Sequence, residues 1–119
     1  MMEHGPIILE ARVAGPTEFV LGLSFTIPIE INYVELPREL REDTEFESGY
    51  QSLIRRTRIV SFSNTGKVAA LPIFQGDRIR AFLKNEFADK PLETREANAI
   101  HLLDDDSMIK ARYAKPGYD

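Results

Sequence analysis

Residues 18–34 read EFVLGLSFTIPIEINYV, and every odd position in this stretch carries an apolar side chain. Most of the even positions are polar, glycine or proline. Because successive side chains of a β-strand point to opposite faces, the odd positions share one face of an extended chain. The members of this apolar stripe are Phe19, Leu21, Leu23, Phe25, Ile27, Ile29, Ile31 and Tyr33.

The length of this stretch limits how it folds. At about 3.3 Å per residue, a straight strand over 19–33 would reach about 50 Å. A compact chain of this size has a radius of gyration of only about 13–14 Å. We therefore expect two consecutive strands, 18–27 and 29–35, with a kink at Pro28, which has no amide hydrogen for a ladder. An arm exchanged between subunits is the alternative.

Two hairpins are expected, one before and one after the acidic segment 37–52. Residues 7–13 alternate like the stripe, and a Gly-Pro turn joins them to 18–27. Residues 56–63 and 67–74 flank an Asn-Thr-Gly turn, whose residues tolerate left-handed backbone geometry. Each pair is predicted to fold back on itself as antiparallel strands.

Helices are expected in the charged segments. A short helix is predicted over 37–43, starting at Pro37, and the rest of 37–52 is interpreted as a connection. A second helix is predicted over 77–89, with Asp77 as its N-cap. Its apolar stripe consists of Ile79, Phe82, Leu83 and Phe87.

The sequence leaves two interpretations open for the C-terminal part. The favoured interpretation is a helix over 91–102 followed by a strand over 108–113. The alternative is a hairpin in which 97–103 pairs with 108–113 through the turn Asp104-Asp105-Asp106-Ser107.

Length and composition indicate one α+β domain. The 119 residues suit a single core over 1–119, with 1–5 and 115–119 expected to fray. We predict an antiparallel sheet of five to six strands with one or two helices packed on one face. The absence of cysteine excludes disulfides and thiolate metal sites. No apolar run is long enough to span a membrane and no signal-peptide pattern opens the chain, so we expect a cytoplasmic protein with no membrane contact.

Charge is unevenly distributed along the chain, whose formal net charge is −4. Residues 1–54 hold 3 basic and 10 acidic side chains, whereas residues 55–90 hold 8 basic and 3 acidic ones. A basic block in an acidic chain indicates either an anionic partner or pairing with acidic parts of the same molecule.

Catalytic and metal-binding patterns are weak. The two histidines, His4 and His101, lie in none of the HxH, HxxxH or HExxH spacings typical of metal sites. The carboxylates of 104–106 follow one another in a turn and should point in different directions. Residues 63–67 lack the glycine and hydroxyl pattern of a phosphate-binding loop. We expect no metal and no cofactor, and a small enzyme using His101 is the least favoured function.

The favoured function is a non-catalytic protein-binding or assembly module. Eight apolar side chains on one stretch exceed what a small sheet readily covers, and exposed strands pair with other chains. We therefore expect a homodimer along 18–35, with the apolar stripe as its interface, or a different protein as partner.

The alternative function is single-stranded nucleic-acid binding by an OB-like barrel. Cations that follow phosphates and rings that stack on bases are typical of such proteins. The candidate residues are Arg55, Arg56, Arg58, Lys67, Arg78, Arg80 and Lys84. This alternative requires 91–102 to be extended, and it competes with pairing of the arginines to the acidic segment 39–47.

Overall fold

The computed structural model describes residues 5–20, 24–63, 71–84 and 90–110. Its strands are β1 (Ile7–Val13), β2 (Glu18–Val20), β3 (Ser24–Glu35), β4 (Thr57–Ser63), β5 (Arg78–Leu83), β6 (Glu96–Leu102) and β7 (Ser107–Lys110). Its helices are α1 (Arg38–Arg41), α2 (Thr44–Gln51) and the 3₁₀ turn η2 (Leu92–Thr94). The predicted α+β fold with a mostly antiparallel sheet is confirmed.

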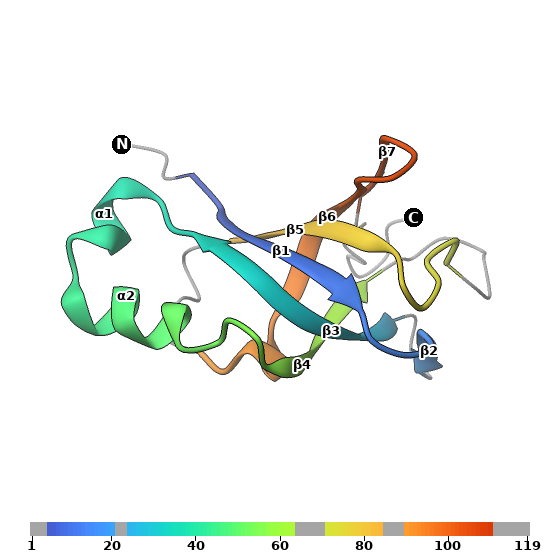
Figure 1. Cartoon of the computed structure of the whole chain (residues 1–119), viewed down its shortest axis with the longest axis horizontal. Coiled ribbons are helices and arrows are strands. Elements are labelled where there is room, and N and C mark those ends of the chain that lie inside the picture. Colours follow the sequence, from blue (N-terminus) through green and yellow to red (C-terminus); the bar gives the residue numbers. More distant parts are fainter. Residues whose placement is uncertain (1–4, 21–23, 64–70, 85–89, 111–119) are drawn as a thin grey trace, which may run out of the picture.

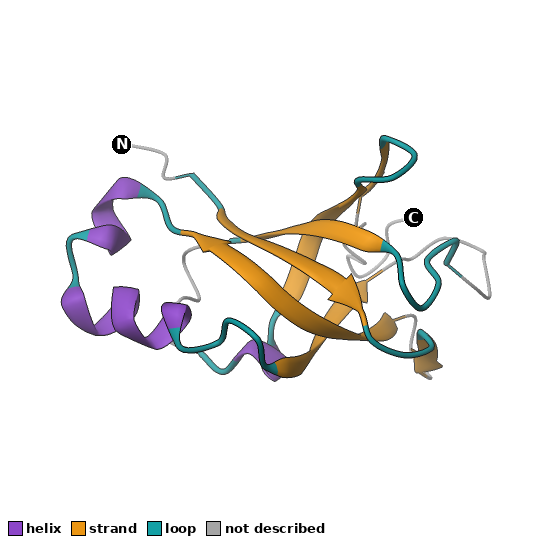
Figure 2. Ribbon diagram, in the orientation of Figure 1, coloured by secondary structure: helices purple, strands orange, loops and turns teal. Residues whose placement is uncertain are grey.

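Five of the strands close into a barrel. β1 pairs with both β3 and β5, β3 pairs with β4, β4 pairs with β6, and β6 pairs with β5. Every one of these pairs is antiparallel except β4 and β6, which run parallel (Figure 1). β2 attaches to β3 and β7 to β6, outside this circuit. Helices α1 and α2 gather at one end of the barrel (Figure 2).

The barrel interior is filled by alternate residues of its strands. Ile7, Leu9, Ala11 and Val13 of β1 point inward, as do Ile79, Ala81 and Leu83 of β5. On β3 the inward residues are Phe25, Ile27, Ile29 and Ile31, each at most 1% exposed. Burying aliphatic and aromatic side chains of this size contributes roughly 1.5–3 kcal/mol each.

The alternation on β3 changes phase at a β-bulge. Glu10 lies opposite Tyr33, but the next residue of β1, Ala11, lies opposite Ile31. Asn32 is therefore the extra residue, and such a residue reverses the facing of everything after it. Tyr33 is consequently 47% exposed, whereas Val34 is 4% exposed.

Burial changes the interpretation of the apolar stripe. Its four central members, Phe25 to Ile31, are enclosed within one molecule, so the expected excess of uncovered apolar side chains does not exist there. They are inaccessible to a second subunit unless the barrel opens. Phe19 and Tyr33 are exposed, and Leu21 and Leu23 lie outside the described residues.

The strand pairing differs from the expected first hairpin. β3 continues through Pro28 without a break, and β1 pairs with its second half, from Val13 opposite Ile29 to Ile8 opposite Glu35. The Pro28 carbonyl accepts from Ala14 N at 2.8 Å, just beyond the end of β1. The N–H and C=O groups of one strand residue point to the same edge of the strand. Pro28 therefore lacks its N–H on the edge that faces β1, at a position where β1 has already ended.

Both longer helix predictions are wrong. Residues 78–83 form β5, because Ile79, Ala81 and Leu83 alternate with more exposed side chains. Residues 96–102 form β6, which pairs with β7, so the hairpin alternative is confirmed as far as Lys110. Residues 111–113 of the predicted second strand lie outside the described part. In β6 the extra residue Asn98 interrupts the strict alternation that identifies a strand from sequence.

Some of the remaining predictions are confirmed and others are wrong. The short helix after Pro37 is confirmed as α1, but α2 lies in the segment interpreted as a connection. The predicted strand 56–63 is confirmed as β4. The described part of its predicted partner, 71–74, is not a strand. It leads into a turn in which the Asp77 carboxylate accepts a hydrogen bond from Phe74 N at 2.8 Å. Residues 67–70 and 85–89 lie outside the described part. None of the helices in the described ranges is long and apolar enough to cross a membrane.

Because of the bulge at Asn32, two residues of the apolar stripe, Ile31 and Tyr33, should differ in how much they contribute to stability. We expect Ile31→Ala to lower the free energy of unfolding by roughly 2–5 kcal/mol, because it opens a cavity in the barrel. Tyr33→Ala removes a half-exposed ring and should cost less than about 1 kcal/mol. Urea unfolding of both variants measures this difference. Equal losses would mean that the alternation continues unbroken and that the bulge is absent.

Candidate functional site

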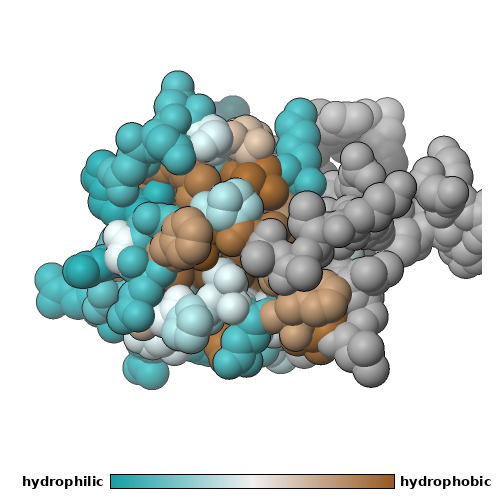
Figure 3. Space-filling model, turned by 90° about the vertical axis from the view of Figure 1, so that its right-hand side faces the viewer, coloured by the Kyte–Doolittle hydropathy of each residue, from teal (hydrophilic) through white to brown (hydrophobic). Residues whose placement is uncertain are grey.

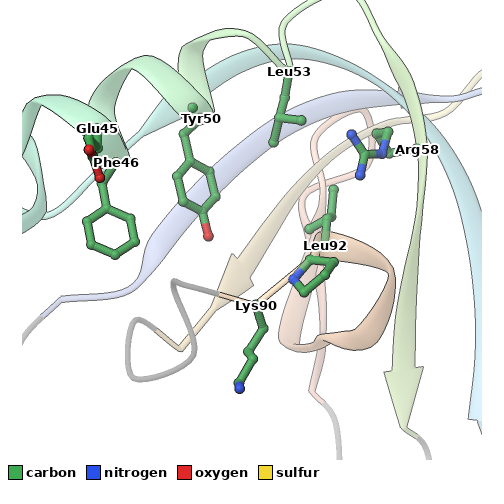
Figure 4. A pocket seen from close by; sticks show the side chains of 9 residues that line it. Glu45, Phe46, Tyr50, Leu53, Arg58, Lys90 and Leu92 are labelled. Atoms are coloured by element: carbon green, nitrogen blue, oxygen red, sulfur yellow. The ribbon is translucent and has the colours of Figure 1, made fainter.

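Helix α2 supplies one wall of a pocket. Its N-cap is Asp43, whose Oδ1 accepts from Glu45 N at 3.0 Å and from Phe46 N at 3.3 Å. Such a cap stabilises a helix by about 1 kcal/mol. Phe46 and Tyr50 are four residues apart and therefore share one face of the helix. They point toward the segment that carries Lys90 and Leu92 (Figure 4).

The pocket lies between α2 and η2 and has a volume of about 410 Å³. Its lining consists of Glu45, Phe46, Gly49, Tyr50, Leu53, Arg58, Lys90, Pro91 and Leu92 (Figure 4). The walls are mainly aromatic and aliphatic, and Glu45, Arg58 and Lys90 supply charge. Gly49 faces open space, because a Cβ added there would meet nothing within 4 Å.

A buried arginine holds the aromatic wall in place. Arg95 is 4% exposed, and its guanidinium donates to the hydroxyl of Tyr50 and to the carbonyl oxygen of Lys84. Tyr50 is 7% exposed. Charged donors make the stronger hydrogen bonds in proteins, so this contact fixes the ring of Tyr50 against the base of the pocket.

A paired arginine forms the opposite rim. Arg58 donates from Nε to Oε2 of Glu93 and from Nη2 to Oε1 at 2.8 Å. These hydrogen bonds raise the pKa of the Arg58 guanidinium and lower the pKa of the Glu93 carboxyl. The positive charge of Arg58 is therefore balanced within the chain.

The structure does not bring the predicted basic residues together. Arg78 donates to Asp104 at 2.7 Å and Arg80 to Glu10 at 2.8 Å, both on the outer surface of β5. The hydrogen bonds from Arg78 lower the pKa of the Asp104 carboxyl. Two barrel strands, β1 and β3, separate β5 from β4 on one side, and β6 separates them on the other.

The other predicted cations occupy different places. Arg55 is exposed with a φ of 74°, and Arg56 Nε donates to the Ser52 carbonyl at 3.1 Å. Lys84 is half-buried, and Lys67 lies outside the described residues. In the described part, the arginines that form ion pairs use Glu93, Asp104 and Glu10 rather than the acidic segment 39–47.

His101 lies on the outer surface of β6, with Nε2 2.8 Å from Asp106 Oδ1. It lines neither the α2–η2 pocket nor the small cleft beside Asp77. The three carboxylates of 104–106 turn to different partners: Asp104 to Arg78, Asp105 to Ser107 and Asp106 to His101. No group of three metal-ligating side chains occurs among the described residues.

Apolar side chains are also exposed at the other end of the barrel. Figure 3 views the molecule from the side on which β2 and the 71–77 turn lie, and apolar atoms gather near the middle of that face. Phe19 is 46%, Val20 42% and Phe74 68% exposed. The rings of Phe19 and Phe25 are tilted with centroids 5.0 Å apart, so Phe19 extends the barrel core outward.

Sequence reasoning missed the pocket because it missed α2. Phe46, Tyr50 and Leu53 follow helical spacing, and Asp43 with Glu45 and Glu47 after it is a typical helix start. These signals were sufficient to find the helix. Leu92 lines the pocket only because β4 and β6 pair, and the local sequence pattern does not show that pairing.

Comparison of the chain with family models, with curated proteins and with solved structures finds no match. The geometry defines a class of protein, namely a small closed β-barrel with an apolar pocket under a helix at one end.

The Arg58–Glu93 pair gives a pH-dependent prediction. Because the pKa of Glu93 is lowered in the folded state, its contribution to stability is present above the ordinary glutamate pKa of about 4.3 and is lost as the pH falls through the folded value. We expect Glu93→Gln to lower the free energy of unfolding by about 0.5–1 kcal/mol at pH 7. The difference from the original protein should shrink as the pH falls below about 4.3. Urea unfolding across this range measures it, and a difference that does not change with pH would contradict the assignment.

Proposed function

We propose that the protein is a non-catalytic protein-binding module, and that its pocket between α2 and η2 takes up an apolar side chain of the partner. The observation that carries this proposal is the pocket itself. Cavities of 150 Å³ can hold a benzene ring, and this one measures about 410 Å³. It has room for an aromatic or leucine side chain together with adjoining backbone.

The polar groups of the pocket support binding rather than chemistry. The Tyr50 hydroxyl accepts from Arg95, and the Arg58 guanidinium is held by Glu93. Groups fixed in this way hold the walls of the pocket in one orientation. Apolar walls with a few charged groups at the rim are typical of pockets that anchor one buried residue of a partner.

Gly49 offers a direct test of the pocket. Gly49→Leu places a side chain in the open space of the pocket, and leucine favours a helix more than glycine does, so the free energy of unfolding should rise by about 0.5–1 kcal/mol. The matched control is Ser48→Leu, which adds the same side chain at an exposed position of α2 outside the lining. The probes are amidated pentapeptides of sequence Gly-Ser-X-Ser-Gly, where X is Trp, Leu or Ala.

We expect the Trp and Leu peptides, but not the Ala peptide, to shift the amide resonances of Gly49 and Leu92. Ser48→Leu should leave this binding unchanged, and Gly49→Leu should weaken it at least ten-fold. Unaltered binding by Gly49→Leu would refute the proposal. Light scattering at micromolar concentration should give the 13.5 kDa mass of one chain. A dimer that Gly49→Leu disperses would identify a second copy as the occupant.

Nucleic-acid binding is the second candidate, and one observation favours it. Counted along the barrel, the first strand pairs with the second and fourth, and the third runs parallel to the fifth, which is the strand order of OB-type barrels. Against it stand the paired arginines. We expect no binding of a fluorescein-labelled oligothymidylate at low salt. Binding that weakens steeply as salt rises would favour this candidate instead.

A further inference from the structure

The outer face of β2, β3, β4 and β6 is a second surface with a distinct chemistry. One register row crosses all four strands: Glu18 lies opposite Thr26, Thr26 opposite Ser61, and Ser61 opposite Glu96. Residues directly opposite each other project from the same face of a sheet. The row therefore carries a carboxylate at each end and two hydroxyls between them. We call this surface the acidic face; Glu30 and Ile59, from the neighbouring rows, complete it.

The charges of the acidic face have one sign. In the paired segments of these strands that the structure describes, the outward charged side chains are Glu18, Glu30 and Glu96. All three are exposed, and none belongs to an ion pair of the described part. Arg12 lies opposite Glu30 on β1, at the border of the face. The field over the face therefore attracts cations and repels phosphates.

The uncharged residues of the acidic face suit a peptide. The hydroxyls of Thr26 and Ser61 make no hydrogen bond to other described side chains or backbone, so their donors and acceptors remain available to a partner. Ile59 is 45% exposed beside them and offers apolar surface. Lysine and arginine cover apolar surface with their alkyl stems while the charged head reaches a carboxylate.

The spacing of the row fits an extended chain. Three strand-to-strand steps of about 4.8 Å separate Glu18 from Glu96, which is about 14 Å. Four residues of an extended peptide cover about 14 Å at about 3.4 Å each. A peptide lying across the strands would bring basic side chains at positions i and i+4 to the two carboxylates.

We propose that the acidic face docks an extended basic segment of a partner protein, with basic residues four apart over Glu18 and Glu96. This surface is separate from the α2–η2 pocket, and the proposal does not depend on that pocket being occupied.

The probe is a fluorescein-labelled peptide with three lysines spaced four apart, Lys-Thr-Ala-Thr-Lys-Thr-Ala-Thr-Lys, at low salt. The test variant is Glu18→Gln with Glu96→Gln. The matched control is Glu42→Gln with Glu47→Gln, an exposed and a half-buried acid of the α1–α2 region that change the net charge equally. Gly49→Leu serves as a second control, because it blocks the pocket and leaves the acidic face unchanged.

We expect anisotropy titrations to show at least five-fold weaker binding for the Glu18–Glu96 variant, less than two-fold change for the Glu42–Glu47 variant, and no change for Gly49→Leu. A peptide of the same composition with its lysines adjacent should bind more weakly. An equal loss of peptide affinity in both double variants would mean that net charge alone explains the binding, and it would overturn the proposal. The absence of any peptide binding would overturn it as well. Oligothymidylate that binds and is displaced by the peptide would also overturn it, because the face would then accept phosphates.

Discussion

The structure depends on one strand being shared by two neighbours. β3 contacts β4 along residues 24–30 and β1 along residues 29–35, so a single twelve-residue strand joins the two halves of the barrel. Closure removes the edges that a strand of this length would expose. It also buries the apolar stripe inside one molecule. The bulge at Asn32 lies within the half of β3 that pairs with β1, where it turns Tyr33 outward and brings Val34 into the core.

The arginines of β4 and β5 are mostly neutralised by carboxylates of the same chain. The arginines of β4 and β5 that form ion pairs use carboxylates of segments distant in sequence, Glu93, Asp104 and Glu10. Exposed pairs of this kind contribute little stability each, about 0–1 kcal/mol. Their effect is on recognition, since a balanced cation attracts anions weakly. Three arginines of the basic block thus lie in three separate ion pairs, while the three glutamates of the acidic face form no ion pair with the described residues.

The sequence predicted the fold class and several strands, and its errors have common physical causes. Alternation found β1, β4 and the first part of β3 because their inward residues are regular, but it placed Tyr33 with the inward residues because it did not show the bulge at Asn32. It failed at β6, where the extra residue Asn98 interrupts the alternation. It also failed at β5, where Phe82 fills an outward position that periodicity alone cannot distinguish from a core position. Helix α2 was predictable from its cap and spacing, but the pocket as a whole was not, because its other walls come from segments that only barrel closure brings beside α2.

β4 and the turn before it link the two proposed surfaces. Arg55 N donates to the Ile31 carbonyl at 2.6 Å, and Ile31 N donates to Arg56 O at 3.1 Å. These hydrogen bonds hold the end of the α2 segment against β3, next to the bulge, and the left-handed backbone of Arg55 is tolerated there at a cost of about 1–2 kcal/mol. From this anchor, β4 turns Arg58 toward the pocket and Ile59 and Ser61 toward the acidic face. A partner that contacts both surfaces would therefore meet a rigid strand rather than a loop, and ordering the binding surface would cost little free energy on association.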